Sequence, residues 1–252
     1  MLNTFSKFYF GHFINQSNKS LPFNDGTDKV ATLKVGDYTL NEFGVEIARA
    51  LNAASSISFT VTVNRTTRLI TIAGDSNFEL HVASGTASNP FSLIGFSGSD
   101  RSGSNSYTGN LASGSEFKNQ LKLQKFVDFT DDQTASYSNV AKSANGTVEV
   151  ISFGTDEFMT CEIAYQTNNN VTGSAIENQA NGLDNLRTFL QYAVNKRKVE
   201  FIPDRDTPGT FTKCILESTN ASSSGTGYRL KEYLSSTPGF FSSGVLKFRK
   251  VV

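Results

Sequence analysis

The chain has 252 residues and carries 23 basic and 23 acidic side chains, so its formal net charge is zero. A neutral total disfavours a genome-packaging role and attraction to an anionic membrane, because both need an excess of positive charge. Charged residues make up only 18% of the chain, and Ser, Thr, Asn and Gly take their place. This composition is typical of strands, turns and long polar loops.

The cysteines and the first residues indicate where the protein folds. Cys161 and Cys214 lie far apart and outside any CxxC spacing, which favours two free core thiols over a disulfide. The opening segment, MLNTFSKFYFGHF, lacks the apolar stretch and cleavage site of a signal peptide. No segment approaches the ~20 apolar residues that span a bilayer. We therefore expect folding in a cytoplasm without export.

The first expected elements are two strands separated by a loop. Residues 5–14, FSKFYFGHFI, alternate well enough to predict a strand. Residues 15–27 contain Asn-Asp-Gly and one Pro, so they are typical of a loop. A second strand is expected at residues 29–35.

The sharpest local signal is a helix over residues 38–52. Thr39 can cap the first amide groups while Glu42, three residues later, reaches back to complete a capping box. Apolar residues recur at four-residue spacing, which predicts one buried face. These residues are Phe43, Ile47 and Leu51.

Three strands are expected after the helix, at residues 58–64, 69–73 and 78–82. The first two are separated by Arg65 to Arg68, a length that suits a β-hairpin. The hairpin and the helix together predict an α+β unit.

Residues 97–115, SGSDRSGSNSYTGNLASGS, are nearly free of large apolar groups. We expect a flexible or surface-draped loop there and a domain boundary close by. Turns are expected at Asp131-Asp132 and Asn145-Gly146. Further strands are expected at residues 121–129, 148–153 and 157–165.

A second polar interruption, at residues 167–173, precedes a second helix predicted at about 183–196. Its apolar stripe consists of Leu183, Leu186, Leu190, Ala193 and Val194. A Ser- and Gly-rich hairpin tip is expected at residues 220–227. The remaining strands are expected at residues 199–202, 211–217, 228–233 and 245–251.

These elements predict an α+β fold that is mainly antiparallel β. We expect two β-rich domains, each with one packed helix. The first is a β-α-β-hairpin domain at residues 1–110. The second is a β domain at residues 111–252, with its helix near 183–197.

Residues suited to catalysis are scarce. A nucleophile triad needs a histidine that accepts a proton, and only His12 and His81 are present, both inside expected strands. With Cys161 and Cys214 they lack the paired spacing of a zinc site. The Gly-rich stretches lack the motifs that cradle phosphate. We therefore expect no enzyme activity, no cofactor, no metal, and no catalytic or ligand-binding residue set.

Carboxylates and basic residues each leave two interpretations open. Oxygen-rich loops can hold calcium, but turns also use Asp to bond their own backbone, and the turn interpretation is favoured. The clusters concerned are Asp128, Asp131 and Asp132, and Asp204 and Asp206 on either side of Arg205. The run at residues 195–198 can contact phosphates, but a helix end that satisfies its own carbonyls is favoured.

Residues 33–96 contain three motifs in order: LKVGDYTLNEFGVEIARALNAA, SFTVTVNRTTRLITIAGDSNFEL and NPFSLIGF. Together they resemble a module of virion structural proteins of tailed bacteriophages. The module covers about a quarter of the chain and marks an architecture rather than a position in the particle. The matching residues are Gly36, Tyr38, Thr39, Ala50, Leu51, Asn52, Phe59, Val61, Ile70, Ile72, Phe78, Leu80, Leu93, Gly95 and Phe96.

The C-terminal part, with LDNLRTFLQYAVNKRK, VEFIPD, KCILES and GVLKFRKV, resembles the end of phage tail and baseplate proteins. In those proteins a β domain with one packed helix forms rings around the tail axis. The resemblance implies a ring-forming structural subunit of the tail tip or baseplate that joins the tail tube to the hub or fibres. Its implied partners are copies of itself and other phage structural proteins, with no nucleic acid or membrane. It would be part of the virion, assembled in the host cytoplasm.

Other functions stay open. The chain can instead be a neck, head-decoration or fibre protein, a receptor- or carbohydrate-binding module with Tyr107 or Tyr137 as a stacking surface, or a tail-associated wall hydrolase. For a ring, the contacts are expected in the polar loops at residues 97–115, 167–173 and 220–227. Exposed strand edges would be paired in the particle, so the isolated protein should form rings or aggregate.

Overall fold

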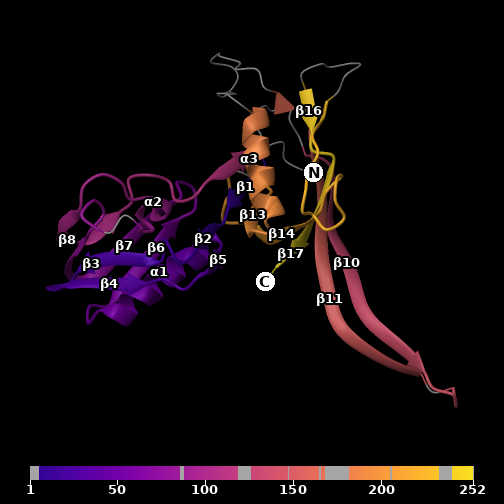
Figure 1. Cartoon of the computed structure of the whole chain (residues 1–252), viewed down its shortest axis with the longest axis horizontal. Coiled ribbons are helices and arrows are strands. Elements are labelled where there is room, and N and C mark those ends of the chain that lie inside the picture. Colours follow the sequence, from indigo (N-terminus) through magenta and orange to yellow (C-terminus); the bar gives the residue numbers. More distant parts are fainter. Residues whose placement is uncertain are drawn as a thin grey trace. The chain divides into compact units, whose positions relative to one another are not determined.

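The computed structural model describes residues 6–85, 88–118, 126–146, 148–164, 166–167, 182–204, 206–232 and 240–251 (Figure 1). Within these residues the fold is α+β and mainly antiparallel β, with two long helices and one short helix. The predicted fold class is therefore confirmed. The expected strand at 121–129 is described only from Phe126 onward, and residues 168–173 of the second polar interruption lie outside the described residues.

The chain divides into two compact units, each made of segments that are separated in sequence. The helix–hairpin unit comprises Lys7–Phe117 and Arg197–Phe211. The ribbon unit comprises Met1–Ser6, Lys118–Lys196 and Thr212–Val252. The domain limits expected from the sequence, 1–110 and 111–252, stay a prediction.

The helix–hairpin unit holds three sets of antiparallel strands and two helices. Its strands are β1 (Lys7–Phe10), β2 (His12–Ile14), β3 (Ser20–Asn24), β4 (Asp28–Thr32), β5 (Gly36–Tyr38), β6 (Phe59–Asn64), β7 (Leu69–Leu80), β8 (Arg101–Thr108), β9 (Glu116–Lys118) and β13 (Val199–Ile202). Its helices are α1 (Leu40–Ala54) and α2 (Phe91–Ile94). In the main sheet β7 is central and pairs with β6, β3 and β8, while β4 pairs with β3.

Helix α1 forms as the sequence predicts, and it begins with the expected capping box. The Thr39 amide donates to Glu42 Oε2 at 2.9 Å, and the Thr39 side chain accepts from the Glu42 amide. The predicted apolar stripe is fully buried against the sheet that Figure 1 shows along the helix. A Cβ at Gly44 would lie 2.8 Å from Val63 Cγ2, so the glycine allows the helix to lie close to the hairpin.

The predicted hairpin at 58–73 is confirmed, because β6 and β7 pair in register from Phe59–Gly74 to Asn64–Leu69. The two strands expected at 69–73 and 78–82 are, however, the single strand β7. The polar residues between them produce a register shift opposite β8 instead of a turn.

Three other sequence predictions in this unit are wrong. The single strand expected at residues 5–14 is instead two strands, β1 and β2. The strand is interrupted at Gly11, whose amide donates to the Lys198 carbonyl. The expected loop at 15–27 contains β3, which accommodates Pro22 opposite Val30. The expected loop at 97–115 contains β8, since a strand can pair with β7 through its backbone without apolar side chains.

The ribbon unit contains a long hairpin, two further sets of strands and one helix. Its strands are β10 (Phe126–Lys142), β11 (Val148–Ile163), β12 (Gln166–Thr167), β14 (Thr212–Ser218), β15 (Lys231–Glu232), β16 (Phe240–Ser242) and β17 (Val245–Lys250). Its helix is α3 (Gly182–Val194), close to the predicted range, with Phe189 packed 6.5 Å from Phe248 between ring centroids. Strand β17 lies between β11 and β14.

The hairpin of β10 and β11 is longer than the sequence indicated. The turn predicted at Asn145-Gly146 is confirmed, with Gly146 at φ +87°. The turn predicted at Asp131-Asp132 is wrong, because β10 continues through it with register shifts opposite β11. Bulges absorb the irregular residues and keep the strand paired.

A buried ion pair holds Arg197–Phe211 to the rest of the helix–hairpin unit. Arg65, in the β6–β7 turn, donates to Glu200 of β13 at 2.5 Å, and the Glu200 side chain is 1% exposed. Arg65 also donates to the Pro208 carbonyl at 2.6 Å and lies 3.8 Å from the Phe211 ring centroid. One guanidinium therefore fixes both β13 and the segment that follows it.

We expect Arg65→Ala to lower the free energy of unfolding by about 3–5 kcal/mol, because it leaves the Glu200 carboxylate buried without its cation. Urea unfolding followed by circular dichroism measures this change. The matched control is Arg187→Ala, which removes an exposed ion pair with Asp184 and should cost less than about 1 kcal/mol. Equal losses in the two variants would contradict the anchoring role of Arg65.

Candidate functional site

The pairing of β11 changes along its length. Residues Phe158–Glu162 lie between β10 and β17, whereas Val148–Glu157 pair with β10 alone. Among the described strands none lies on the outer side of β10. We call the two-stranded segment of Thr134–Lys142 and Val148–Glu157 the outer ribbon (Figure 1). At ~3.3 Å per residue it is roughly 30 Å long.

The base of the outer ribbon is fixed by ion pairs to β17. Arg249 contacts Asp156 at 2.5 Å, and Lys250 contacts Glu157 at 3.5 Å. Beyond this base, Gly154 adopts φ +111° next to a register shift, a backbone conformation that favours glycine. Such a bulge bends the strand, and Figure 1 shows the hairpin curving.

The outer ribbon has the properties of a surface that pairs with another chain. Val148 and Val150 are 55% and 62% exposed. A two-stranded hairpin without a third strand is only marginally stable in water. Its open edges also present backbone donors and acceptors to any neighbouring strand. Any strand that paired with one of these edges would therefore stabilise the ribbon.

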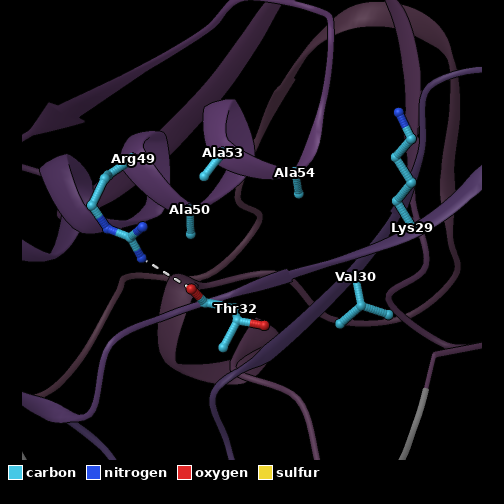
Figure 2. Close-up of a pocket in the computed structure, with 7 residues that line it drawn as sticks. All are labelled: Lys29, Val30, Thr32, Arg49, Ala50, Ala53 and Ala54. Atoms are coloured by element: carbon cyan, nitrogen blue, oxygen red, sulfur yellow. Dashed lines mark hydrogen bonds between the residues drawn. The ribbon is translucent and has the colours of Figure 1, made fainter.

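A second open edge lies in the helix–hairpin unit. Strand β4 is the edge of its sheet among the described strands, and a groove of about 550 Å³ runs between it and α1. Figure 2 shows the small side chains of α1 above the groove and the β4 residues along its other side. The groove is lined by Lys29, Val30, Thr32, Arg49, Ala50, Ala53 and Ala54.

One end of this groove is closed by polar contacts. Arg49 donates to the Thr32 carbonyl at 3.0 Å and to Glu46 at 2.6 Å, and Glu46 also accepts the Lys34 amide at 2.6 Å. Burial raises the pKa of the Glu46 carboxyl, but the hydrogen bonds from Arg49 and the Lys34 amide outweigh it and lower that pKa. Glu46 therefore stays charged and keeps Arg49 in place.

The loops expected to carry contacts are arranged differently from the prediction. Residues 97–115 include the paired strand β8. Residues 220–227 form hydrogen-bonded turns, and the predicted hairpin is wrong because β14 pairs with β17 whereas β15 pairs with β16. Of residues 167–173 only Thr167 is described, in β12. Contacts through these loops stay a prediction, and the two open edges are further candidate contact surfaces, which the sequence analysis expected in general but did not locate.

His12 lies in β2 as predicted and is 1% exposed. Its Nε2 is 2.8 Å from Ser113 Oγ, and that hydroxyl lies 2.7 Å from the Leu93 carbonyl, to which it donates. A hydroxyl has one hydrogen, so His12 is the donor to Ser113. A nucleophile pair needs the opposite polarity, with the imidazole accepting the hydroxyl proton. The pair therefore anchors the chain around Ser113.

The remaining chemical candidates have structural surroundings. Cys161 and Cys214 are buried thiols that are not joined in a disulfide, as predicted, and burial raises the pKa of the Cys161 thiol to about 12. The Asp206 amide donates to Asp204 Oδ1 at 3.1 Å, which supports the turn interpretation there. Within the described part of the chain, no group of three or more His, Cys, Asp or Glu side chains is arranged to hold a metal. The side chains of Asp128, Asp131 and Asp132 lie outside the described set.

Tyr107 is not a stacking surface, contrary to the binding-module hypothesis. It is 9% exposed, and its hydroxyl donates to the Phe78 carbonyl at 2.8 Å. The rings of Tyr107 and Phe78 pack edge to face at 5.0 Å. A β8 side chain that faces the core explains this burial. The side chain of Tyr137 lies outside the described set.

The run at residues 195–198 satisfies helix carbonyls at its first residues, as the sequence analysis favoured. Asn195 Nδ2 donates to the Gln191 carbonyl at 2.7 Å, and the Lys196 amide donates to the Ala193 carbonyl at 3.0 Å. Lys196 donates to the Leu216 carbonyl at 2.6 Å. Arg197 lies 3.2 Å from the Phe13 ring centroid, and Lys198 pairs with Glu42 at 3.1 Å. The helix ends at Val194, so these side chains are already beyond it and reach other segments.

A scan against models of protein families finds none that matches the chain, and a search of curated proteins finds no matching relative. In the described helices, none has the length and hydrophobicity needed to cross a membrane.

His12 predicts a specific pH dependence of stability. Burial, with Arg68 nearby, lowers its pKa to about 4, whereas the unfolded chain has a pKa near 6.5 and takes up the proton first as pH falls. Stability should therefore decrease as pH falls from about 6.5 to about 4, by about 3 kcal/mol from this group, and level off below that.

Urea unfolding at a series of pH values checks this prediction. His12→Gln should remove that part of the slope, because glutamine can still donate to Ser113 and does not titrate. His81→Gln, at a histidine whose side chain is 21% exposed, should keep it. An unchanged slope in His12→Gln would show that other groups cause the loss of stability.

Proposed function

We propose that the chain is a structural subunit of a tailed-bacteriophage particle, and that it forms a symmetric ring in the tail tip or baseplate and joins the tail tube to the hub or fibres. The observation that carries the proposal is the outer ribbon, a two-stranded segment whose edges pair with no third strand among those described. A subunit of a closed ring can leave such edges open because the next copy covers them.

The composition of buried groups supports a structural rather than a chemical role. The buried charged and polar side chains described above tie segments of the chain to one another, as Arg65 and Glu200 do for β13 and as His12 and Ser113 do around α2. Each of these groups is already used in a contact that stabilises the fold.

The phage-like module supports the proposal at the level of architecture. Its residues form a capped helix packed on a β-hairpin, followed by the short helix α2. Most of its matching apolar residues belong to one core. These are Ala50, Leu51, Phe59, Ile70, Ile72, Phe78, Leu80 and Phe96. The resemblance thus rests on positions that determine folding, and the tail-tip position is the part of the proposal that needs a direct test.

The purified chain should form rings, visible by negative-stain electron microscopy and by native mass spectrometry as one discrete multiple of the 27.4 kDa subunit. Antibody labelling of intact particles should place the chain at the tail tip. Labelling at the neck, head or fibres would change the proposed place of the chain in the particle, but the chain would still be a virion structural protein. A chain that is monomeric at every concentration and absent from particles would overturn the proposal.

Shortening the outer ribbon should abolish assembly and leave the fold intact. The change removes residues 139–151 and joins Ser138 to Ser152, which are opposite each other in the hairpin, through Asn-Gly, a sequence that favours tight hairpin turns. Analytical ultracentrifugation should show a monomer, because the exposed valines and about half of each open edge are gone. A matched control replaces only residues 143–147 with Asn-Gly and should still assemble; rings from the shortened chain would contradict the role of the ribbon.

A further inference from the structure

The turn between β10 and β11 brings an asparagine, a glycine and a hydroxyl group together at the surface. Asn145 precedes Gly146, and the Gly146 amide donates to the Ser143 carbonyl at 2.9 Å, which closes a four-residue turn. The Ser143 hydroxyl donates to Asn145 Oδ1. Residues 141–146 are all exposed, so water reaches the Asn145 side chain.

Gly146 has the backbone freedom that a reaction with the Asn145 side chain needs. It adopts φ +87°, and a Cβ built on it would meet nothing within 4 Å. Because glycine has no side chain, its nitrogen can approach a neighbouring group in conformations that other residues avoid. The Gly146 nitrogen belongs to the peptide bond that follows Asn145, so its attack on Asn145 Cγ closes a small, cyclic imide.

The hydrogen bond that holds the Gly146 amide lies at the end of the outer ribbon (Figure 1). A hairpin without a third strand is only marginally stable in water. Hydrogen bonds at the exposed ends of such elements open at little cost in free energy. The Gly146 nitrogen is therefore released from the Ser143 carbonyl without unfolding of the rest of the chain.

We propose that Asn145 is a site of spontaneous covalent modification, at which water replaces the side-chain amide and leaves an aspartyl or isoaspartyl residue. The Gly146 nitrogen gives its proton to a base in solution and attacks Asn145 Cγ. A Cγ–N bond forms, the Cγ–Nδ2 bond breaks, and Nδ2 takes up a proton and leaves as ammonia. Water then opens the imide at either of its two carbonyl carbons, so the reaction needs no oxidant, reductant or cofactor.

The Ser143 hydroxyl makes this asparagine more reactive than its sequence alone would. The attack on Cγ places negative charge on Asn145 Oδ1, the atom to which Ser143 already donates. A hydrogen-bond donor held at the oxygen where charge develops lowers the barrier of such an addition. Ser143 should therefore accelerate the loss of the amide in the folded chain.

The modification changes the tip of the outer ribbon. The aspartyl product adds one negative charge, and the isoaspartyl product adds a methylene group to the backbone of the turn. Since turn length fixes the register of a hairpin, the isoaspartyl form should lose the pairing of Lys142 with Val148. This modification goes beyond the proposed function and does not depend on it, because it takes place within one chain.

A second turn of the chain has similar residues and should resist the same chemistry. Asp25 precedes Gly26, whose φ is +108°. The Asp25 side chain is 1% exposed, accepts from Lys29 at 2.8 Å and also accepts from the Ser55 hydroxyl. An ionised carboxylate held in this way is a poor target for a nucleophile, so Asp25 provides an internal control.

The first test incubates the purified full chain at neutral and at mildly alkaline pH and follows its peptides by mass spectrometry. The peptide with Asn145 should gain the mass difference between an amide and an acid, faster at alkaline pH, and should separate into aspartyl and isoaspartyl forms. Peptide mapping distinguishes it from the other Asn-Gly pair, at residues 181–182. The peptide with Asp25 should stay unchanged. An unmodified Asn145 at both pH values would overturn the proposal.

The second test compares Ser143→Ala with Ser143→Thr, which keeps the hydroxyl group. Ser143→Ala should slow the conversion of Asn145 several-fold, and Ser143→Thr should convert like the wild type, with equal circular dichroism. In urea, where the turn is absent, the three chains should convert at the same rate. Conversion of the folded Ser143→Ala chain as fast as the wild type, or faster, would overturn the role of Ser143.

Discussion

The backbone hydrogen-bonding requirement of β-strands governs this molecule. Strands inside a sheet, such as β7 and β17, satisfy that requirement on both sides, and at the β4 edge α1 supplies partners for the Thr32 carbonyl and the Lys34 amide. The outer ribbon has neither a strand on both sides nor a helix along its edge among the described elements, because ten residues of β11 pair with β10 alone. Among the described strands no third strand pairs with the outer ribbon, so its edges present backbone groups that an added strand would satisfy.

Ion pairs between segments that are distant in sequence stabilise the fold although some of its strand edges are unpaired. Arg65 bonds Glu200 and the Pro208 carbonyl, so a segment nearly 140 residues away in sequence is held in the helix–hairpin unit. Arg249 pairs with both Asp156 and Glu217, which fixes the base of the ribbon to two strands. These contacts place charge between segments of the chain, where it holds the fold together.

Local signals in the sequence predicted elements well where the pattern and the packing agree. The capping box and four-residue spacing of α1, the β6–β7 hairpin and the apolar stripe of α3 all appear as expected. Two of the failures share one cause. Residues 101–108 and the polar middle of β10 look like loops because they lack apolar side chains, yet each is held as a strand by a neighbour that no local pattern reveals.

The sequence by itself determined the α+β class, the two long helices and the turn at Asn145-Gly146, because capping, periodicity and glycine conformation act over a few residues. Only the tertiary structure decided which strand edges stay open. Edge exposure depends on which distant strands pair, and β4 and β11 differ from buried strands in their neighbours rather than in their own residues. It also decided that His12 and Tyr107 serve the core, since burial is set by the elements that pack around a side chain.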